Sequence, residues 1–385
     1  MASRSVRTLS TFTSSAGLVA ALCVPLALAC KQAEPSASTG TPSGTSSAPQ
    51  SASATQPQKV EGAPALAGSP TGIVRTVSSD AELLQRPTTA AFRGQQLWVS
   101  IGQLGALFET GKTPRLPFSA IALERSSGAP AGKVELPGND YYPEGIAAAS
   151  DGTLYIGSIM QGIVSKVAAG STTATPFVTV GVSRRGVIGL TVDSTRELLW
   201  LCDSNPKLDD ARKAGELVGV RLSDGTEKVR HVLPPLDGKA PFCNDVIVSP
   251  DGIVWVTDSA GGRVFRIPAE AALTASTAEA WITGGEVGPP PTGGSGANGL
   301  EWVGGTLVVA NVGRGTLVAL DPSSAEPNRG ARVIALSDAQ GAQVTLCSPD
   351  GVELVPGAPD SVVVVENGGC ASKAARLSEV KLVLR

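Results

Sequence analysis

A short motif that recurs along the chain most strongly limits what it can fold into. Each copy places an oxygen-bearing residue, then a glycine or aspartate, ahead of an apolar run, a turn and a second apolar run. The copies follow one another at roughly 45 to 55 residues, a period typical of β-propeller blades. The four clearest openings are Pro143-Glu144-Gly145-Ile146, Cys243-Asn244-Asp245-Val246, Ala297-Asn298-Gly299-Leu300 and Pro349-Asp350-Gly351-Val352.

Two further copies complete the set, one opening at Ile188 and a weak first one at Ala90. The copies at Glu144 and Asn244 match at an offset of 100 residues, and both carry an Asp-Gly turn between two β runs. Six units of four strands predict an all-β, six-bladed β-propeller in which each blade is stabilised by its neighbours. The alternative is a β-sandwich, which would not explain the fixed order of motif, turn and paired runs.

A propeller has to close its ring, because an open ring would leave unpaired sheet edges. Residues 72–77 precede the first copy and are expected to supply the outer strand of the last blade. Their expected neighbour is the run 379–384. This closure assigns residues 71–385 to the propeller.

The first 29 residues are expected to be an export signal rather than part of the fold. Their apolar run is too short for a membrane span and ends at Leu26-Ala27-Leu28-Ala29-Cys30. This ending resembles a bacterial lipoprotein signal, which implies a lipidated Cys30; the alternative is ordinary secretion with cleavage after Ala29. Residues 30–70, rich in Ser, Thr, Pro and Ala, are expected to be a disordered linker.

Charge and histidine content argue against several classes of site. The net charge is −3 and no Lys/Arg cluster carries interleaved aromatic residues, so nucleic acid is not an expected partner. The one histidine, His231, lies between repeats and is expected to be a solvated loop residue. Zinc sites with several histidines and a Ser-His-Asp triad at the repeat openings therefore have little support.

The repeat openings predict a ring of oxygen ligands. The innermost strands of a propeller run along its axis, so the residues that open them surround one mouth of the channel. Glu144, Asn244, Asn298 and Asp350 then form a hard set of two carboxylates and two amides, suited to Ca²⁺, with Zn²⁺, Mn²⁺ or Mg²⁺ as alternatives. Without a cation the two acids would repel each other, and one pKa would rise. Taken singly, Asn and Asp before Gly are also ordinary turn formers.

These motifs, at steps of 100, 54 and 52 residues, resemble the senescence-marker-protein, gluconolactonase and luciferin-regenerating-enzyme family, which includes regucalcin. The resemblance covers about residues 141–366 and implies a divalent cation on the propeller axis and hydrolysis of sugar lactones or other small esters. It implies that Glu144, Asn298 and Asp350 are metal ligands and that Asn244 contacts the substrate or completes the metal shell. It also implies that Asp350 is the general base of a metal-assisted hydrolysis.

Two departures from the family pattern are visible. The family glutamate usually lies in the first blade, whereas a whole repeat precedes Glu144 here, so the ring closes one blade out of phase. Sugar-lactone members often carry an arginine two residues before the asparagine that matches Asn244, and this place is Phe242 here. We therefore expect a generic or more apolar lactone or ester rather than a polyhydroxylated acid lactone.

The cysteines outside the signal form an even set in a chain expected to be exported: Cys202, Cys243, Cys347 and Cys370. Cys202 ends the second strand of the third blade, on the same rim as Cys243 at the start of the fourth. Cys347 and Cys370 stand in the same relation within the last blade. The repeat alignment therefore predicts the disulfides Cys202–Cys243 and Cys347–Cys370.

Two other features are expected to be structural. Trp98, Trp200 and Trp255 fall in equivalent second strands and are expected to pack the blades. The glycine-rich run 284–296 lacks the strand-to-helix context of a phosphate-binding loop and is expected to be a loop before the fifth blade.

The sequence thus favours a metal-dependent lactonase or esterase whose partner is a small-molecule substrate. The protein is expected to be a monomer held in the bacterial cell envelope through acylated Cys30, on a periplasmic or outer-surface face. The alternative is a non-catalytic propeller that binds a small ligand or a protein at the envelope, because the same fold serves as a scaffold for both.

Overall fold

The computed structural model describes residues 68–179, 185–206, 215–370 and 373–384. The predicted export signal, Cys30 and the linker up to residue 67 lie outside these residues. Within the described ranges, no helix combines the length and the apolar character needed to cross a membrane.

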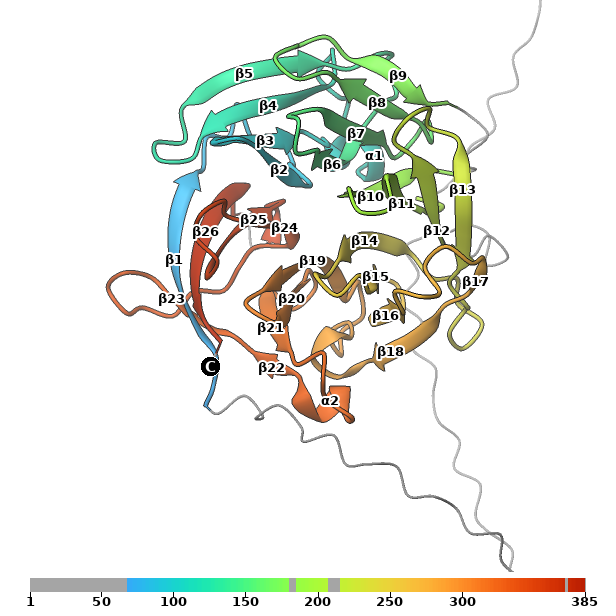
Figure 1. Cartoon of the computed structure of the whole chain (residues 1–385). Helices are drawn as coiled ribbons and strands as arrows, with labels where there is room; N and C mark the ends of the chain where they lie inside the picture. The colour runs from blue at the N-terminus through green and yellow to red at the C-terminus, as the bar shows by residue number, and fades with distance from the viewer. Residues whose placement is uncertain (1–67, 180–184, 207–214, 371–372, 385) are drawn as a thin grey trace, which may run out of the picture. The chain divides into compact units, whose positions relative to one another are not determined.

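Six sheets are arranged around a central axis, each with its first strand innermost (Figure 1), as the repeat predicts. From its inner to its outer edge, the first blade contains β2 (Ala90–Arg93), β3 (Gln96–Ser100), β4 (Ser119–Glu124) and β5 (Pro130–Glu135). The second blade contains β6 (Pro143–Ala148), β7 (Leu154–Ser158), β8 (Val164–Val167) and β9 (Thr175–Val178). The third blade contains β10 (Val187–Asp193), β11 (Leu198–Asp203), β12 (Glu216–Arg221), β13 (Glu227–Val232) and β17 (Ser276–Thr277).

The last three blades complete the ring. The fourth blade contains β14 (Cys243–Val248), β15 (Val254–Asp258), β16 (Arg263–Ile267) and β18 (Glu279–Thr283). The fifth blade contains β19 (Ala297–Val303), β20 (Thr306–Asn311), β21 (Thr316–Leu320) and β22 (Arg332–Val333). The sixth blade contains β24 (Pro349–Leu354), β25 (Ser361–Glu366), β26 (Arg376–Val383), β1 (Thr71–Ser78) and β23 (Ala335–Ser337). The helices are α1 (Leu104–Phe108), η1 (Gly285–Val287) and α2 (Pro327–Gly330).

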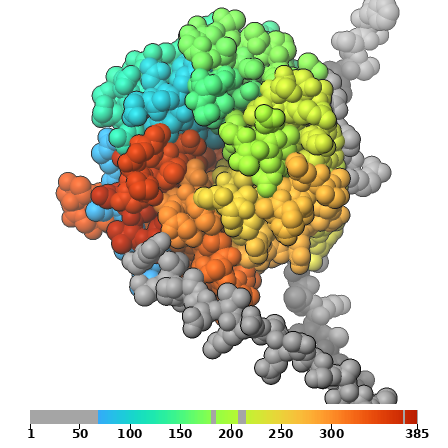
Figure 2. Space-filling model, viewed as in Figure 1, coloured from blue at the N-terminus to red at the C-terminus, as the bar shows by residue number. Residues whose placement is uncertain are grey.

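The ring closes as the sequence predicts. β1 pairs antiparallel with β26, from Thr71 opposite Val383 to Ser78 opposite Leu377. The first strand of the described chain therefore completes the last blade, and Figure 2 shows that red blade packed beside the cyan first blade. Two outer strands were not predicted: β17 adds to the third blade and β23 to the sixth, both in parallel register.

The core lies between the blades, because the second strand of each sheet is covered on both faces. Every residue of β11, β20 and β25 is buried, which explains their continuous apolar runs. Trp98, Trp200 and Trp255 are buried in these second strands, as predicted. Each lies at an interface between blades rather than in a cofactor pocket.

The prediction for His231 is wrong. The residue lies in β13, is fully buried, and places its ring between Ser276 and Ala272. Val229 and His231 are buried along this strand, whereas Glu227, Lys228 and Val232 are exposed. The high charge of the segment concealed a strand with period-two burial.

The two predicted disulfides are present on the rim where the repeats open. Cys202 bonds to Cys243 across the third and fourth blades, and Cys347 bonds to Cys370 within the sixth. The glycine-rich run is a loop before the fifth blade that includes η1. It is fixed by Asn311, whose side-chain amide donates to the carbonyls of Glu286 and Gly288.

Candidate functional site

The recurring motif coincides with an irregularity in the inner strands. In β6 the pairing passes from Pro143 opposite Ser158 to Ile146 opposite Ile156, so one extra residue is inserted. The same shift occurs at the openings of β10, β14, β19 and β24. A β-bulge interrupts the regular alternation of side chains and re-aims the bulged residue. Each oxygen-bearing motif residue lies in such a bulge.

Glycine follows the motif residue because the next inner strand approaches too closely for a side chain. A Cβ on Gly145 would lie 2.1 Å from the Ile188 carbonyl oxygen, and one on Gly299 would lie 2.1 Å from the Asp350 carbonyl oxygen. Successive motifs are therefore in contact around the ring. In the first blade the motif position is Thr88, whose carbonyl accepts from the Gly351 N–H and whose hydroxyl donates to the Glu144 carbonyl.

The two predicted acidic ligands are buried and interact through their charges. Glu144 is 5 % exposed and Asp350 is 4 % exposed. Burial raises the pKa of Glu144 well above its usual value, and the charges of Asp350 and Asp245 raise it further. These three residues belong to the second, sixth and fourth blades. Carboxylates from such separated blades can act on one another only across the central channel.

Asp350 has partners that Glu144 lacks. Burial raises its pKa to about 7, while hydrogen bonds from Asn367 and Asn298 oppose the rise and the charge of Asp245 adds to it. The Asn367 side chain donates to Asp350 Oδ2 at 2.9 Å. No hydrogen bond reaches the carboxylate of Glu144 from the described part of the chain.

Asn298 carries a buried oxygen without a partner. The residue is 7 % exposed, and its Oδ1 accepts no hydrogen bond from any described residue. A buried polar atom in this state costs about 1–3 kcal/mol unless a ligand satisfies it. Asn244, the remaining member of the predicted ring, is 8 % exposed at the opening of β14.

This donor set fits a hard divalent cation. The described residues contain no group of three or more His, Cys, Asp and Glu side chains arranged to hold a metal. The predicted set differs in kind, because it has two carboxylates and amide oxygens. A cation would relieve the repulsion between Glu144 and Asp350 and satisfy Asn298 Oδ1, and oxygen-only ligands are those that Ca²⁺ prefers.

Three further carboxylates line the same channel, and sequence reasoning missed them as a set. Asp245 takes the place of the motif glycine, and Glu301 and Glu353 each lie three residues after a motif residue. Each accepts a backbone N–H from the next inner strand: Asp245 from Leu300 at 3.2 Å, Glu301 from Leu354 at 3.1 Å and Glu353 from Phe92 at 3.3 Å. The equal spacing of Glu301 and Glu353 from the motif residues of successive repeats was the available signal.

Burial also raises the pKa of these three groups. The pKa values of Asp245 and Glu301 rise to about 7, opposed by their backbone hydrogen bonds. The pKa of Glu353 rises well above its usual value through burial and the charge of Glu301. The channel therefore concentrates five acids, of which three hold neighbouring blades together.

Apolar side chains also lie near the openings of the second to fourth blades, beside Glu144 and Asn244. Ile188 occupies the motif position of the third blade and is fully buried. Phe242, two residues before Asn244, and Met160, just after β7, are partly buried against the same apolar cluster. We call Ile188, Phe242 and Met160 the apolar arc and Asn298 and Asp350 the polar arc. Glu144 and Asn244 lie in the same blades as the apolar arc.

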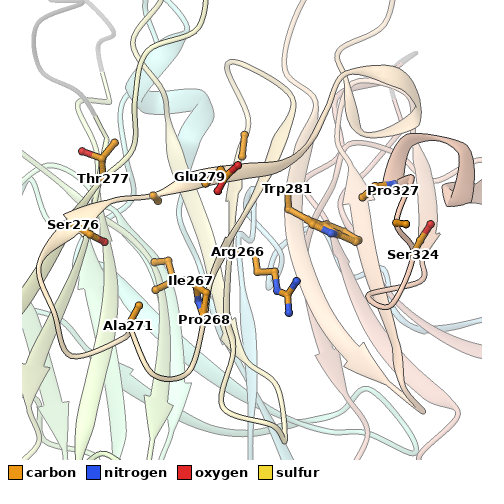
Figure 3. A pocket seen from close by; sticks show the side chains of 13 residues that line it. Arg266, Ile267, Pro268, Ala271, Ser276, Thr277, Glu279, Trp281, Ser324 and Pro327 are labelled. Carbon is orange, nitrogen blue, oxygen red and sulfur yellow. The ribbon is translucent and has the colours of Figure 1, made fainter. Parts of the chain in front are cut away.

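A separate groove lies on the outer edge of the ring, between the fourth and fifth blades (Figure 3). Its volume is about 590 Å³, and a second hollow of about 500 Å³ shares Trp281 and Pro327 with it. Trp281 projects between Arg266 on one side and Ser324 on the other, and its ring meets Trp255 edge-on at 5.0 Å. None of the channel acids lines this groove, so it is distinct from the axial site.

Comparison with known proteins supports the fold. No protein-family model and no curated protein matches the sequence. Among solved structures, the calcium-binding protein regucalcin from Agrobacterium tumefaciens is 14 % identical, with a TM-score of 0.56 over 80 % of this chain and 94 % of that one. A luciferin-regenerating enzyme is also 14 % identical, with a TM-score of 0.57 over 80 % of this chain and 95 % of that one.

A third similar structure has a different activity. It is a catalytically inactive histidine-to-alanine variant of virginiamycin B lyase from Staphylococcus aureus with quinupristin, which is 10 % identical. Its TM-score is 0.51 over 81 % of this chain and 100 % of that one. The fold of this chain is therefore similar to those of regucalcin, luciferin-regenerating enzyme and this lyase, and fold similarity alone does not choose among their activities.

Proposed function

We propose that the protein is a divalent-cation-dependent hydrolase of lactones or small esters and a distant member of the gluconolactonase and regucalcin family. The observation that carries the proposal is the partnerless, buried Oδ1 of Asn298 beside Asp350, with Glu144 coupled to Asp350 across the channel. A purely structural arrangement would satisfy that oxygen and separate those acids.

In this proposal Glu144, Asn298 and Asp350 hold the cation, Ca²⁺ by preference. The bound cation would supply polarisation of the substrate carbonyl. That the similar regucalcin is a calcium-binding protein supports this choice of ion. Asn244, on the neighbouring inner strand, would orient the substrate or complete the metal shell.

Asp350 is proposed to move the proton. Burial raises the pKa of Asp350 to about 7 in the cation-free protein, and a bound cation would lower it. The carboxylate would then be ionised and available as a base at neutral pH. It accepts a proton from water as the water oxygen attacks the carbonyl carbon. It returns the proton to the ring or alcohol oxygen as the ester C–O bond breaks, which yields a hydroxy acid from a lactone and an acid and an alcohol from an ester.

The apolar arc supports a substrate with an apolar substituent. Phe242 and Ile188 offer no hydrogen bonds to sugar hydroxyls, and a buried polar group without a partner would weaken binding. An aliphatic or aryl lactone with its carbonyl toward Asn298 and Asp350 would match both arcs. We further propose that lipidated Cys30 and the linker 30–70 hold the protein in the cell envelope, on the sequence evidence given above.

Two other functions can be weighed against this one. A lyase that depends on a histidine has no support, because the one histidine, His231, is buried in β13 with Nδ1 3.0 Å from Ser276 Oγ and Nε2 3.0 Å from the Ala272 carbonyl. A non-catalytic binding role is the stronger alternative. The groove around Trp281 is the observation that favours it.

The test combines cation binding with turnover. The full-length protein is melted with Ca²⁺, Mg²⁺, Mn²⁺ or chelator, and its hydrolysis of a panel of aliphatic, aryl and sugar lactones and aryl esters is measured. We expect Ca²⁺ to raise the melting temperature and to be required for hydrolysis of apolar members of the panel. Cation binding without any turnover would favour the binding role.

A further inference from the structure

Asn367 is the residue that contacts the proposed general base most directly. It follows β25 in the sixth blade and is partly buried. Its Nδ2 donates to Asp350 Oδ2 at 2.9 Å and also to the carbonyl of Pro87 at the start of the first blade. One amide nitrogen therefore connects the acid to the neighbouring blade.

Equivalent positions in other blades explain one of these bonds but not the other. Ser204 follows β11, and its hydroxyl donates to the Cys243 carbonyl of the fourth blade at 3.0 Å. Ser259 follows β15, and its hydroxyl donates to the Ala297 carbonyl of the fifth blade at 2.6 Å. In every case the acceptor immediately precedes the motif position of the next blade. The bond from Asn367 to Pro87 is thus a repeated structural contact that a serine can make.

The bond to Asp350 is the part that requires an amide. A serine hydroxyl has one hydrogen to donate, whereas an asparagine amide has two and extends further from the backbone. We propose that Asn367 is a positioning residue that fixes the Asp350 carboxylate for cation binding and proton transfer. This inference rests on the function proposed above for Asp350.

The loop that carries Asn367 is held on three sides. The Cys347–Cys370 disulfide closes it against the chain just before Asp350, and the Asn367 N–H donates to the Ser348 carbonyl at 3.0 Å. Arg86 donates to the Gly368 carbonyl at 3.0 Å and pairs with Glu109 at 2.8 Å. These contacts fix the amide before any ligand binds, and such preorganised partners are typical of residues that orient metal ligands.

The repeated serine provides a variant that separates the two bonds. Asn367→Ser retains a donor for the Pro87 carbonyl and loses the donor to Asp350, while Asn367→Ala loses both. We expect Asn367→Ser to bind Ca²⁺ about tenfold more weakly by calorimetry, in the range found for partners of metal ligands. Its kcat on the best lactone should fall by a similar factor with KM nearly unchanged, and its melting temperature in chelator should match wild type. Asn367→Ala should show the same losses and also melt earlier.

Ser259→Ala is the matched control, because it removes the equivalent bond between blades, to the Ala297 carbonyl, without removing a contact to the Asp350 carboxylate. It should lower the melting temperature and leave Ca²⁺ affinity and kcat unchanged. Wild-type Ca²⁺ affinity and kcat in Asn367→Ser would overturn the positioning role. If the wild-type protein binds Ca²⁺ but hydrolyses nothing, the proposed hydrolase activity is wrong. The Ca²⁺ affinity of Asn367→Ser relative to wild type then decides whether Asn367 positions Asp350. A wild-type protein that binds none of Ca²⁺, Mg²⁺ and Mn²⁺ would overturn both.

Discussion

The channel contains two sets of acids that differ in what their oxygens contact. Asp245, Glu301 and Glu353 each accept a backbone N–H from the next blade, so their carboxylates close the seams between the fourth, fifth, sixth and first blades. The carboxylate of Glu144 accepts no hydrogen bond from the described residues, and Asp350 is held by side-chain amides only. We call the first set the seam acids and the second the mouth acids.

The difference shows that burial alone does not mark a ligand. Both sets have raised pKa values, and each contains buried acids, although Glu301 and Glu353 are only partly buried. The seam acids, however, have backbone partners that account for their position. The mouth acids are repelled from each other without such compensation, which makes them the available ligands.

Replacing a mouth acid should abolish activity. Asp350→Ala removes the proposed base and one ligand, so turnover should fall on the order of 10³-fold, within the range for general acid–base groups. Asp360→Ala is the control on the same blade, because Asp360 is exposed and its carboxylate contacts only Lys381, at 3.8 Å, and the neighbouring Ser361 hydroxyl, at 3.1 Å, among the described residues. An Asp350→Ala protein that remains active and fully loaded with metal would exclude Asp350 from both roles.

The mouth and seam acids can be compared directly through the Ca²⁺ affinities of two variants, Glu144→Gln and Glu353→Gln. Both changes remove one buried charge and keep an amide oxygen. Loss of a charged partner of a buried ion typically costs 3–5 kcal/mol, so Glu144→Gln should weaken Ca²⁺ binding on the order of 100-fold or more. Glu353→Gln should change it little. Equal losses in calorimetric titrations of the two variants would show that the seam acids are ligands as well.

Stability should depend on pH in opposite ways with and without cation. The folded-state pKa values of Asp245, Glu301 and Asp350 are raised to about 7 from ordinary values of 3.8, 4.5 and 3.8. Between these limits the folded protein binds more protons than the unfolded chain, so in chelator stability should fall as pH rises from about 4 to 7 and then level off. With Ca²⁺ the stabilisation should grow over the same window, because ligands must be ionised.

Melting curves from pH 4.5 to 8 in chelator and in Ca²⁺ provide the measurement. Glu301→Gln removes one of the titrating groups and should make the fall in chelator shallower. A melting temperature in chelator that rises between pH 5 and 7 would contradict the raised pKa values of the channel acids.

The smallest expected effect concerns the stability that the hydrogen bond between Glu301 and the Leu354 N–H contributes. Glu301→Gln keeps an oxygen for the Leu354 N–H, whereas Glu301→Ala leaves that N–H without its acceptor. Glu301→Ala should therefore be less stable than Glu301→Gln by about 1–2 kcal/mol in urea unfolding. Identical unfolding of the two variants would mean that the seam bond contributes no stability.

The fold could be predicted from the sequence because the blade motif recurs six times. The period, the order of turn and strands, and the run 72–77 predicted the blades and their closure, and the repeat alignment also predicted both disulfides. The inner-strand openings were correctly placed in one ring, since inner strands of a propeller share the axis. Metal ligation by Glu144, Asn298 and Asp350 remains a prediction.

The missed residues share a physical reason. Glu301 and Glu353 follow the bulge, and a bulge changes which later side chains face the channel, so simple alternation from the motif does not place them. Asn367 lies outside the motif, and its role depends on contacts with Asp350 and Pro87, which are 17 and 280 residues away in sequence. Such long-range contacts exist only in the folded ring.

The pairing of β1 with β26 has a consequence for how the molecule is made. Thr71 lies opposite Val383, so the contact that closes the ring joins residues more than 300 positions apart in the chain. Contacts of such long range form slowly, because the intervening loop has to be ordered first. The sixth blade cannot be completed until nearly the whole chain has been synthesised. Since that blade carries Asp350 and Asn367, a chain stalled or cut short before β26 lacks the completed blade that supports its proposed general base.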